Sequence, residues 1–171
     1  MRKLNRPIIM DIEASGFGPD SYPIEVGLAL GDGERYCSLI TPVDDWVHWD
    51  ESAQGVHNIT RDMLKRHGRH PHQIASELND LLEGQTVYSD GWVVDKPWLI
   101  RLFFAAGLDM KFQLSPLEMI MTEPQFAVWD DTKQRLTEEA NIPRHRASND
   151  AWLIQETYRA TTIPPDTAIT G

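Results

Sequence analysis

The sequence predicts one α/β domain built on a mixed β-sheet. Three observations support this fold class: strand-like apolar runs crowd the first part of the chain, helical and strand patterns alternate after them, and 171 residues suffice for one domain with a substantial core. The composition, 41% hydrophobic and 25% charged, is that of a globular protein and excludes global disorder. The domain is expected to span residues 1–171, with a core over about 7–160 and a flexible tail over 161–171.

The first three strands are expected to form an antiparallel meander. Pro7–Glu13 is an apolar run that ends in alternation, and Ile24–Leu30 and Arg35–Ile40 are the second and third strands. Gly31-Asp32-Gly33 supplies turn residues for a hairpin between the last two. Residues 41–60 show little periodicity and are expected to be an irregular connection.

Helices and one further strand follow. Ile74, Leu78 and Leu82 recur at helical spacing, which predicts a helix that ends near Gly84. Gln85–Tyr88 has the pattern of a short strand. Three more helices are expected: one with Pro97 in its first turn that stops near Gly107, one over 124–140 closed by Asn141, and one capped by Ser148 or Asn149 that runs through Tyr158.

The charge and the cysteine content narrow the partners. With 16 basic and 26 acidic residues the formal charge is −10, so nucleic acid has no general electrostatic attraction to the chain outside local basic patches. An excess of carboxylates suits a protein that collects divalent cations. The single cysteine, Cys37, excludes internal disulfides and Cys-rich zinc sites, and favours a reducing cytoplasm. No apolar stretch is long enough for a membrane helix.

Two carboxylates close the first predicted strand. Asp11 and Glu13 are two residues apart, so their side chains leave the same face of the strand. Like charges at that separation repel each other unless a proton or a cation lies between them. The pair therefore indicates either two solvated carboxylates at a strand end or part of a metal site.

Two later segments offer further titratable groups. Asp95 is expected to be the N-cap of the helix that holds Pro97, which is by itself a complete structural explanation. Asp150 lies in the first turn of the last predicted helix, where the macrodipole favours a carboxylate. The macrodipole gives no reason for His145 on the preceding loop.

Taken in order, these segments resemble the motifs of the DEDDh-type 3′–5′ exonucleases, the superfamily of RNase T, oligoribonuclease and polymerase proofreading subunits. The family's Asp-x-Glu-x-x-Gly is Asp11-Ile12-Glu13-Ala14-Ser15-Gly16 here, and its second-motif Asp is Asp95. Its His-x-Ala-x-x-Asp-Ala is His145-Arg146-Ala147-Ser148-Asn149-Asp150-Ala151. The resemblance covers about residues 7–160 and implies an RNase H-like fold, a mixed β-sheet flanked by α-helices.

The resemblance also implies a chemistry. Carboxylates without thiolates suit hard cations, here two Mg²⁺ or Mn²⁺ ions that assist phosphodiester hydrolysis. Asp11 would bridge both ions and Asp95 would support the second. Glu13 and Asp150 would hold the ion that carries the attacking water, whose proton His145 would accept. Substrate contacts are expected from Ser15, Gly16, Phe17 (a wedge under the terminal base), His57 (the substrate backbone) and Trp92 (stacking on a base, where core packing is the more frequent fate of a tryptophan).

The second motif departs from the family pattern. Gly91 and Val94 stand where the family usually has Asn and Phe, and Asp90 stands where it often has His. Asp90 is therefore a rival to Asp95 for the second-motif carboxylate. Asp95 is preferred because its distance to the predicted helix start fits the family pattern.

The segment Lys65–His72 is a basic island in an acidic chain. It indicates either a binding site for substrate phosphates or a solvated loop before a helix, and the sequence leaves both open. A zinc site made by His67, His70 and His72 is disfavoured, because a loop that contains a proline gives no fixed ligand geometry.

The sequence thus predicts an enzyme that removes nucleotides from the 3′ ends of single-stranded RNA or DNA and releases nucleoside 5′-monophosphates. Short substrates are expected, because few basic residues are available for phosphate contacts. Two alternatives stay open: a catalytically inactive RNase H-like module that binds nucleic acid, and a phosphoesterase that acts on small nucleotides. No membrane partner is expected. Several family members form dimers, and the sequence leaves open whether this chain forms a homodimer.

Overall fold

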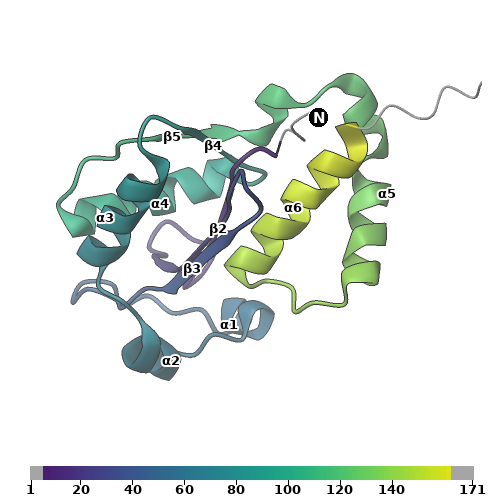
Figure 1. The fold of residues 1–171 in the computed structure, drawn as a ribbon. Helices are drawn as coiled ribbons and strands as arrows, with labels where there is room; N and C mark the ends of the chain where they lie inside the picture. Colours follow the sequence, from purple (N-terminus) through teal and green to yellow (C-terminus); the bar gives the residue numbers. More distant parts are fainter. Residues whose placement is uncertain (1–5, 163–171) are drawn as a thin grey trace, which may run out of the picture.

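The computed structural model describes residues 6–162, which form a five-stranded mixed sheet with helices on both faces (Figure 1). The strand order is β3-β2-β1-β4-β5, so β1 lies at the centre. β1, β2 and β3 are antiparallel neighbours, whereas β4 runs parallel to β1 and β5 parallel to β4. The strands are β1 (Ile9–Ala14), β2 (Pro23–Ala29), β3 (Arg35–Leu39), β4 (Thr86–Ser89) and β5 (Gln113–Pro116).

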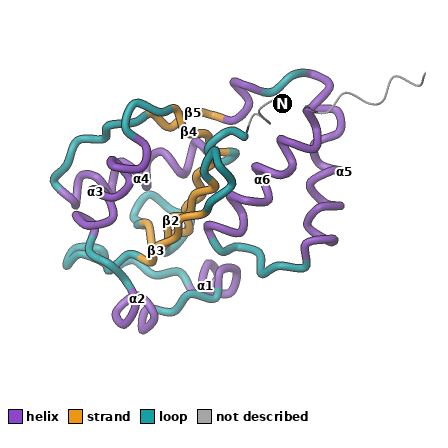
Figure 2. Tube along the Cα trace, in the orientation of Figure 1, coloured by secondary structure: helices purple, strands orange, loops and turns teal. Residues whose placement is uncertain are grey.

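The helices divide between the two faces of this sheet. α3 and α4 cover one face, and α6 lies across β1 and β2 on the other, with α5 packed beside it (Figures 1 and 2). None of the described helices is long and apolar enough to cross a membrane. The helices are α1 (Glu51–His57), α2 (Arg61–His67), α3 (Pro71–Leu82), α4 (Trp92–Ala106), a 3-10 turn (Leu117–Ile120), α5 (Glu123–Ala140) and α6 (Ala147–Thr162).

The alternation of β1 separates two apolar cores. Met10 and Ile12 point into the larger core, which the strands share with α3 and α4. Ile9 points the other way and packs with Ile154 and Tyr158 of α6. Because successive side chains of a strand alternate, Asp11 and Glu13 leave β1 on the same face as Ile9, toward α6.

The predicted meander, hairpin and mixed sheet are confirmed, and the irregular connection over 41–60 is corrected. The seven-residue α1 lies within it, with its first turn capped by Asp50 and its last by Asn58 in the left-handed region. Only Ala53 and His57 of α1 are buried, so the helix has no apolar stripe that periodicity could reveal. α2, the strand β5 and its 3-10 turn were likewise not predicted.

Two predicted helix starts are wrong. α4 begins at Trp92, after Gly91, so Asp95 lies in its first turn and is not the N-cap. Pro97 is therefore the sixth residue of α4 and not in its first turn as predicted, and it lacks the N–H that would donate to the Val93 carbonyl in the helical ladder.

The last helix also starts earlier than predicted. α6 begins at Ala147, so neither Ser148 nor Asn149 is the cap. It continues through Thr161 and Thr162, which corrects the start of the predicted tail, and residues 163–171 lie outside the described part of the chain.

Candidate active site

Three elements bring four carboxylates and one histidine to the end of β1. Asp11 and Glu13 come from β1, Asp95 from the first turn of α4, and Asp150 from the first turn of α6. His145 stands on the loop between α5 and α6, in the left-handed region at φ 59°. The site therefore lies between α4 and α6, at the central strand of the sheet.

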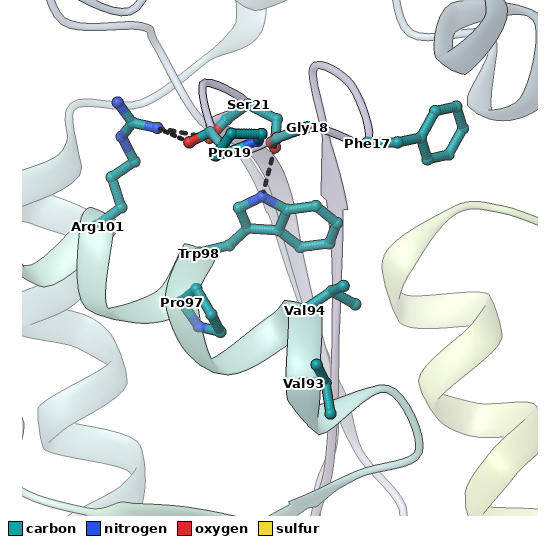
Figure 3. Close-up of a pocket in the computed structure, with 9 residues that line it drawn as sticks. All are labelled: Phe17, Gly18, Pro19, Ser21, Val93, Val94, Pro97, Trp98 and Arg101. Atoms are coloured by element: carbon teal, nitrogen blue, oxygen red, sulfur yellow. Dashed lines mark hydrogen bonds between the residues drawn. The ribbon is translucent and has the colours of Figure 1, made fainter.

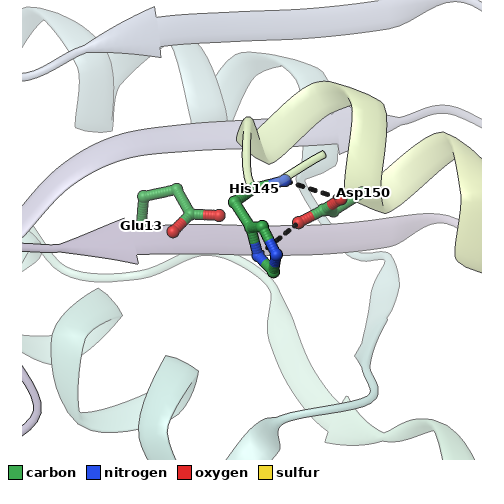
Figure 4. A group of neighbouring side chains, drawn as sticks. All are labelled: Glu13, His145 and Asp150. Carbon is green, nitrogen blue, oxygen red and sulfur yellow. Dashed lines mark hydrogen bonds and ion pairs between the residues drawn. The ribbon is translucent and has the colours of Figure 1, made fainter. Parts of the chain in front are cut away.

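Glu13, His145 and Asp150 form the tightest part of this group (Figure 4). One ligand atom of each residue lies within 4.8 Å of the other two. The backbone N–H of His145 donates to Asp150 Oδ1 at 3.2 Å, and His145 Nδ1 lies 4.0 Å from Asp150 Oδ2. His145 is half exposed, so its ring can reach a molecule in solution.

Asp11 has a buried oxygen without a partner in residues 6–162 and a strongly raised pKa. Its Oδ2 is buried and has no hydrogen-bond partner among the described residues. Burial, with the negative charges of Asp95, Glu13 and Asp150, raises the pKa of Asp11 well above its usual value. A buried carboxylate oxygen without a partner costs free energy, and a cation bound to this atom would remove that cost.

Two more carboxylates titrate abnormally for the same reasons. Burial, followed by the charges of Asp150 and Glu25, raises the pKa of Glu13 to about 8. Burial raises the pKa of Asp95 to about 7, although Ser89 Oγ donates to its Oδ2 at 2.6 Å and opposes the rise.

Such mutual repulsion is relieved by protons or by cations. Oxygen ligands are the donors that Mg²⁺ and Mn²⁺ prefer. The four carboxylates and the unpartnered oxygen of Asp11 therefore fit a divalent-cation site.

Asp95 and its rival Asp90 occupy different surroundings. Asp95 is 2% exposed and its charge acts strongly on Asp11. Asp90 is exposed and its Oδ2 lies 3.4 Å from Lys133 Nζ of α5. Asp90 also contributes to the raised pKa of Asp11, but as the smallest of the four charges. The second-motif assignment stays a prediction, and this geometry favours Asp95.

Glu25 lies next to the site and was not among the predicted site residues, although the segment Ile24–Gly27 also resembles the family pattern. Its fully buried carboxylate accepts hydrogen bonds from Arg146 Nη2 at 2.7 Å and from the Ala147 N–H at 2.7 Å. These bonds tie β2 to the start of α6 and so fix the loop that carries His145. A charged residue inside a strand of otherwise buried residues was the signal that could have revealed it.

The close approach of β2 and α6 depends on Gly27. A Cβ at this position would lie 2.2 Å from the Ser148 backbone nitrogen and 2.3 Å from the Ala147 carbonyl carbon. Only glycine therefore fits where the first turn of α6 rests on β2.

An apolar cleft of about 300 Å³ opens between the β1–β2 loop and α4, the helix that also carries Asp95 (Figure 3). Trp98 forms its floor, with Nε1 donating to Ser21 Oγ at 2.9 Å, and Arg101 donates to the Ser21 carbonyl at 2.7 Å. Phe17 is 69% exposed at the rim, across from Val93. A flat ring placed in the cleft would contact apolar side chains on both sides.

Ser15 and Gly16, both predicted to contact substrate, are packed against other parts of the protein. Ser15 is buried, and its Oγ accepts the Tyr22 N–H at 3.0 Å. A Cβ on Gly16 would lie 2.5 Å from His48 Cε1, so the loop packs tightly there. Because the Ser15 hydroxyl is engaged and Gly16 has no side chain, these residues can contact substrate only through their backbone groups.

His57 and Trp92 do not line the cleft. His57 is 3% exposed, its Nδ1 accepts the Ile59 N–H at 2.9 Å, and its ring packs edge-on against Trp49. The Trp92 indole N–H donates to the Leu114 carbonyl at 2.8 Å, which holds the ring against β5.

The basic island is largely engaged with neighbouring carboxylates. Arg66 pairs with Asp62 at 2.9 Å, and Arg69 forms a two-pronged ion pair with Glu77. Its histidines do not meet: among the described residues, the one cluster of three metal-ligating side chains is that of Glu13, His145 and Asp150. The disfavoured zinc site gains no support.

No protein-family model matches the sequence. No curated protein matches it either. Solved structures do. E. coli exonuclease I in complex with a dA16 oligonucleotide superposes with a TM-score of 0.67 at 14% identity, over 92% of this chain and 41% of that chain. The zinc-bound exonuclease I–ssDNA complex gives 0.67 at 16% identity, over 92% and 40%.

S. pombe Pop2p in its Mg²⁺- and Mn²⁺-bound form gives a TM-score of 0.63 at 16% identity, over 91% of this chain and 82% of that chain. The chain thus spans about 41% of the length of exonuclease I. Exonuclease I is thus among the structural neighbours, and the predicted RNase H-like fold, a mixed β-sheet flanked by α-helices, is confirmed.

Proposed function

We propose, from a fold shared with exonucleases, that this chain is a metal-dependent 3′–5′ exonuclease. It would hydrolyse the last phosphodiester bond of single-stranded RNA or DNA and release a nucleoside 5′-monophosphate. One observation carries the proposal: four carboxylates from three elements converge beside an accessible histidine. Burial and neighbouring negative charges raise the pKa values of Asp11, Glu13 and Asp95, so keeping these carboxylates ionised together costs free energy. A module that only binds nucleic acid gains nothing from that cost.

Each carboxylate has a proposed role in cation binding. Asp11 faces Glu13, Asp150 and Asp95, so it is the residue suited to bridge two cations. Glu13 and Asp150, which cluster with His145, would hold the first, and Asp95 would support the second. When bound, the two cations supply positive charge to the oxygens that become negative during phosphodiester hydrolysis.

His145 is the proposed general base. Its ring is half exposed and its backbone is held by Asp150, so the imidazole can reach a water molecule next to the carboxylates. A histidine can accept the proton of the attacking water near neutral pH. The backbone at His145 is left-handed, and the hydrogen bonds that Arg146 and the Ala147 N–H donate to Glu25 fix the chain directly after it.

The apolar cleft is the proposed site of the terminal nucleotide. Phe17 and Val93 line it from the β1–β2 loop and from α4, and both are exposed. Stacking on such side chains depends on the ring face that every base has, so it selects for an unpaired end rather than for a sequence.

A time course on 5′-labelled RNA and DNA 20-mers tests the proposal. With Mg²⁺ or Mn²⁺ we expect a ladder of products that shorten from the 3′ end, and EDTA is expected to abolish it. The comparison of RNA with DNA gives the sugar preference in the same experiment. Internal cleavage, or hydrolysis of mononucleotides alone, would contradict the proposal.

A further inference from the structure

Arg144 lies directly before His145, on the loop between α5 and α6, and its side chain contacts one of the four carboxylates. Arg144 Nε donates to Asp150 Oδ1 at 2.8 Å, and the same oxygen accepts the backbone N–H of His145 at 3.2 Å. The Asp150 side chain is 11% exposed, so water contributes little to its solvation. A guanidinium charge therefore lies at a carboxylate that is proposed to hold a divalent cation.

This ion pair compensates negative charge in the protein without bound cations. The charge of Asp150 raises the pKa of Asp11 and of Glu13, so the carboxylates lie close enough to repel one another. The guanidinium of Arg144 keeps its proton throughout the pH range in which carboxylates titrate, so it offsets part of this repulsion at any such pH. Arg144 thus supplies, from within the chain, some of the positive charge that a divalent cation would bring.

A guanidinium and a divalent cation on the same carboxylate repel each other. The repulsion is strong where side chains are mostly buried, because protein screens charges less than water does. Among residues 6–162, the Arg144 side chain donates to no acceptor other than Asp150, so this one bond holds it in place. The two positive charges therefore compete for Asp150.

A groove beside the loop has room for the Arg144 side chain away from Asp150. Its volume is about 350 Å³, and it is lined by Arg144 together with residues of α5, including Asp130 and Glu138. Both of these carboxylates are exposed, and Glu138 accepts a hydrogen bond only from the neutral Gln134 within the described part of the chain. The surroundings thus offer Arg144 two positions next to negative charge, which is what a switch requires.

We propose, on the basis of the cation site in the proposed function, that Arg144 is an internal counter-ion of Asp150 that competes with the divalent cation. Arg144 pairs with Asp150 in the metal-free protein and moves into the groove beside α5 when a cation binds. The pair lowers the affinity of the site, so Asp150 receives a cation only at a higher concentration than it would without Arg144. The competition involves no substrate, so cation binding alone tests it.

A titration of metal-free protein with Mn²⁺, followed by electron paramagnetic resonance of the free ion, gives the dissociation constant for each variant. Arg144→Gln removes the guanidinium and keeps a polar side chain. We expect this variant to bind Mn²⁺ about tenfold more tightly than the wild type, which corresponds to about 1.4 kcal/mol.

Lys133→Gln is the matched control, because Lys133 lines the same groove and carries the same charge. Lys133 Nζ lies 3.4 Å from Asp90 Oδ2, and Asp90 is not proposed to hold a cation. The variant therefore measures the effect of removing one nearby charge, which we expect to be less than about threefold. In 1 M KCl, where the Debye length is about 3 Å, the effect of Lys133→Gln should vanish and that of Arg144→Gln should persist.

Nuclear magnetic resonance of the wild type observes the displacement itself and does not depend on how the variants fold. In EDTA, the Nε–H of Arg144, assigned through its own side-chain carbons, is expected to exchange slowly with water because it donates to Asp150. Saturating Mg²⁺ is expected to abolish this protection. Shifts of the Glu13 and Asp150 amide signals show in the same titration that the cation is bound.

The outcomes separate this inference from the proposed function. If neither the wild type nor Arg144→Gln binds Mn²⁺, the proposed cation site is wrong, and this inference with it. If both bind Mn²⁺ and Arg144→Gln binds it no more tightly than the wild type or Lys133→Gln, the cation site stands and Arg144 is not its competitor. An Arg144 Nε–H that stays protected in saturating Mg²⁺ overturns the displacement as well.

Discussion

Replacing Glu13 by Gln is expected to stabilise the metal-free protein at pH 8. Burial and the neighbouring carboxylates raise the pKa of Glu13 from 4.5 to about 8. A carboxyl group with a raised folded-state pKa binds more protons in the folded than in the unfolded protein, so the stability of the fold decreases as pH rises from about 4.5 to about 8. At about 1.36 kcal/mol per pH unit, the full rise corresponds to about 5 kcal/mol.

The substitution recovers only part of this penalty. The pKa values of Asp11 and Asp95 are also raised, so the repulsion is shared and the remaining carboxylates keep some of it. We expect a gain of about 2–3 kcal/mol at pH 8, which for a chain of this length raises Tm by roughly 4–12 °C. At pH 5 the gain should be below about 1 kcal/mol, because Glu13 is then protonated in the folded state and only partly ionised in the unfolded chain.

Thermal unfolding followed by circular dichroism in EDTA, at pH 5, 6.5 and 8, measures this difference. Glu139→Gln is the control, because Glu139 lies on the exposed face of α5 and pairs only with Arg135. Mg²⁺ is expected to raise the Tm of the wild type at pH 8 more than that of the Glu13 variant. Equal Tm values for wild type and Glu13→Gln at pH 8, or a difference that does not vary with pH, would show that ionised Glu13 does not destabilise the metal-free fold.

Three further predictions concern the site. Asp95→Asn should reduce kcat by at least a hundredfold and Asp90→Asn by less than tenfold; equal losses in steady-state assays would mean that the second motif is misassigned. Gly27→Ala should lower both Tm and activity, because its Cβ meets the backbone of α6 at 2.2 Å, whereas Gly55→Ala, where no atom lies within 4 Å, should lower neither in the same melting and activity assays. Phe17→Ala should raise KM about tenfold with kcat little changed, as expected for lost stacking on the terminal base; an unchanged KM would exclude the cleft.

The sequence predicted the parts of the site that local patterns encode. The alternation of β1 placed Asp11 and Glu13 on one face, and the structure confirms that both lie there, toward α6. His145 and Asp150 fall at the start of a helix, as the capping pattern around residue 148 indicated within two residues. These features depend on neighbours in the chain, which a sequence displays directly.

Features that depend on distant contacts were missed. The carboxylate of Glu25 is explained only by Arg146 and Ala147, more than 100 residues away along the chain. β5 has four residues and too little pattern to predict; its pairing with β4 defines it. α4 starts at Trp92, whose indole N–H donates to the carbonyl of Leu114 on β5, a contact that the position of Pro97 could not reveal.

A titration of metal-free protein with Mn²⁺, followed by electron paramagnetic resonance, counts the cations that the carboxylates bind without relying on turnover. We expect two bound Mn²⁺ ions per chain for the wild type and at most one for Asp11→Asn, whose carboxylate is proposed to bridge both. Asp90→Asn should keep both ions. A wild type that binds no Mn²⁺, or an Asp11→Asn variant that binds as many ions as the wild type, would contradict the assignment of the carboxylates as a two-cation nuclease centre.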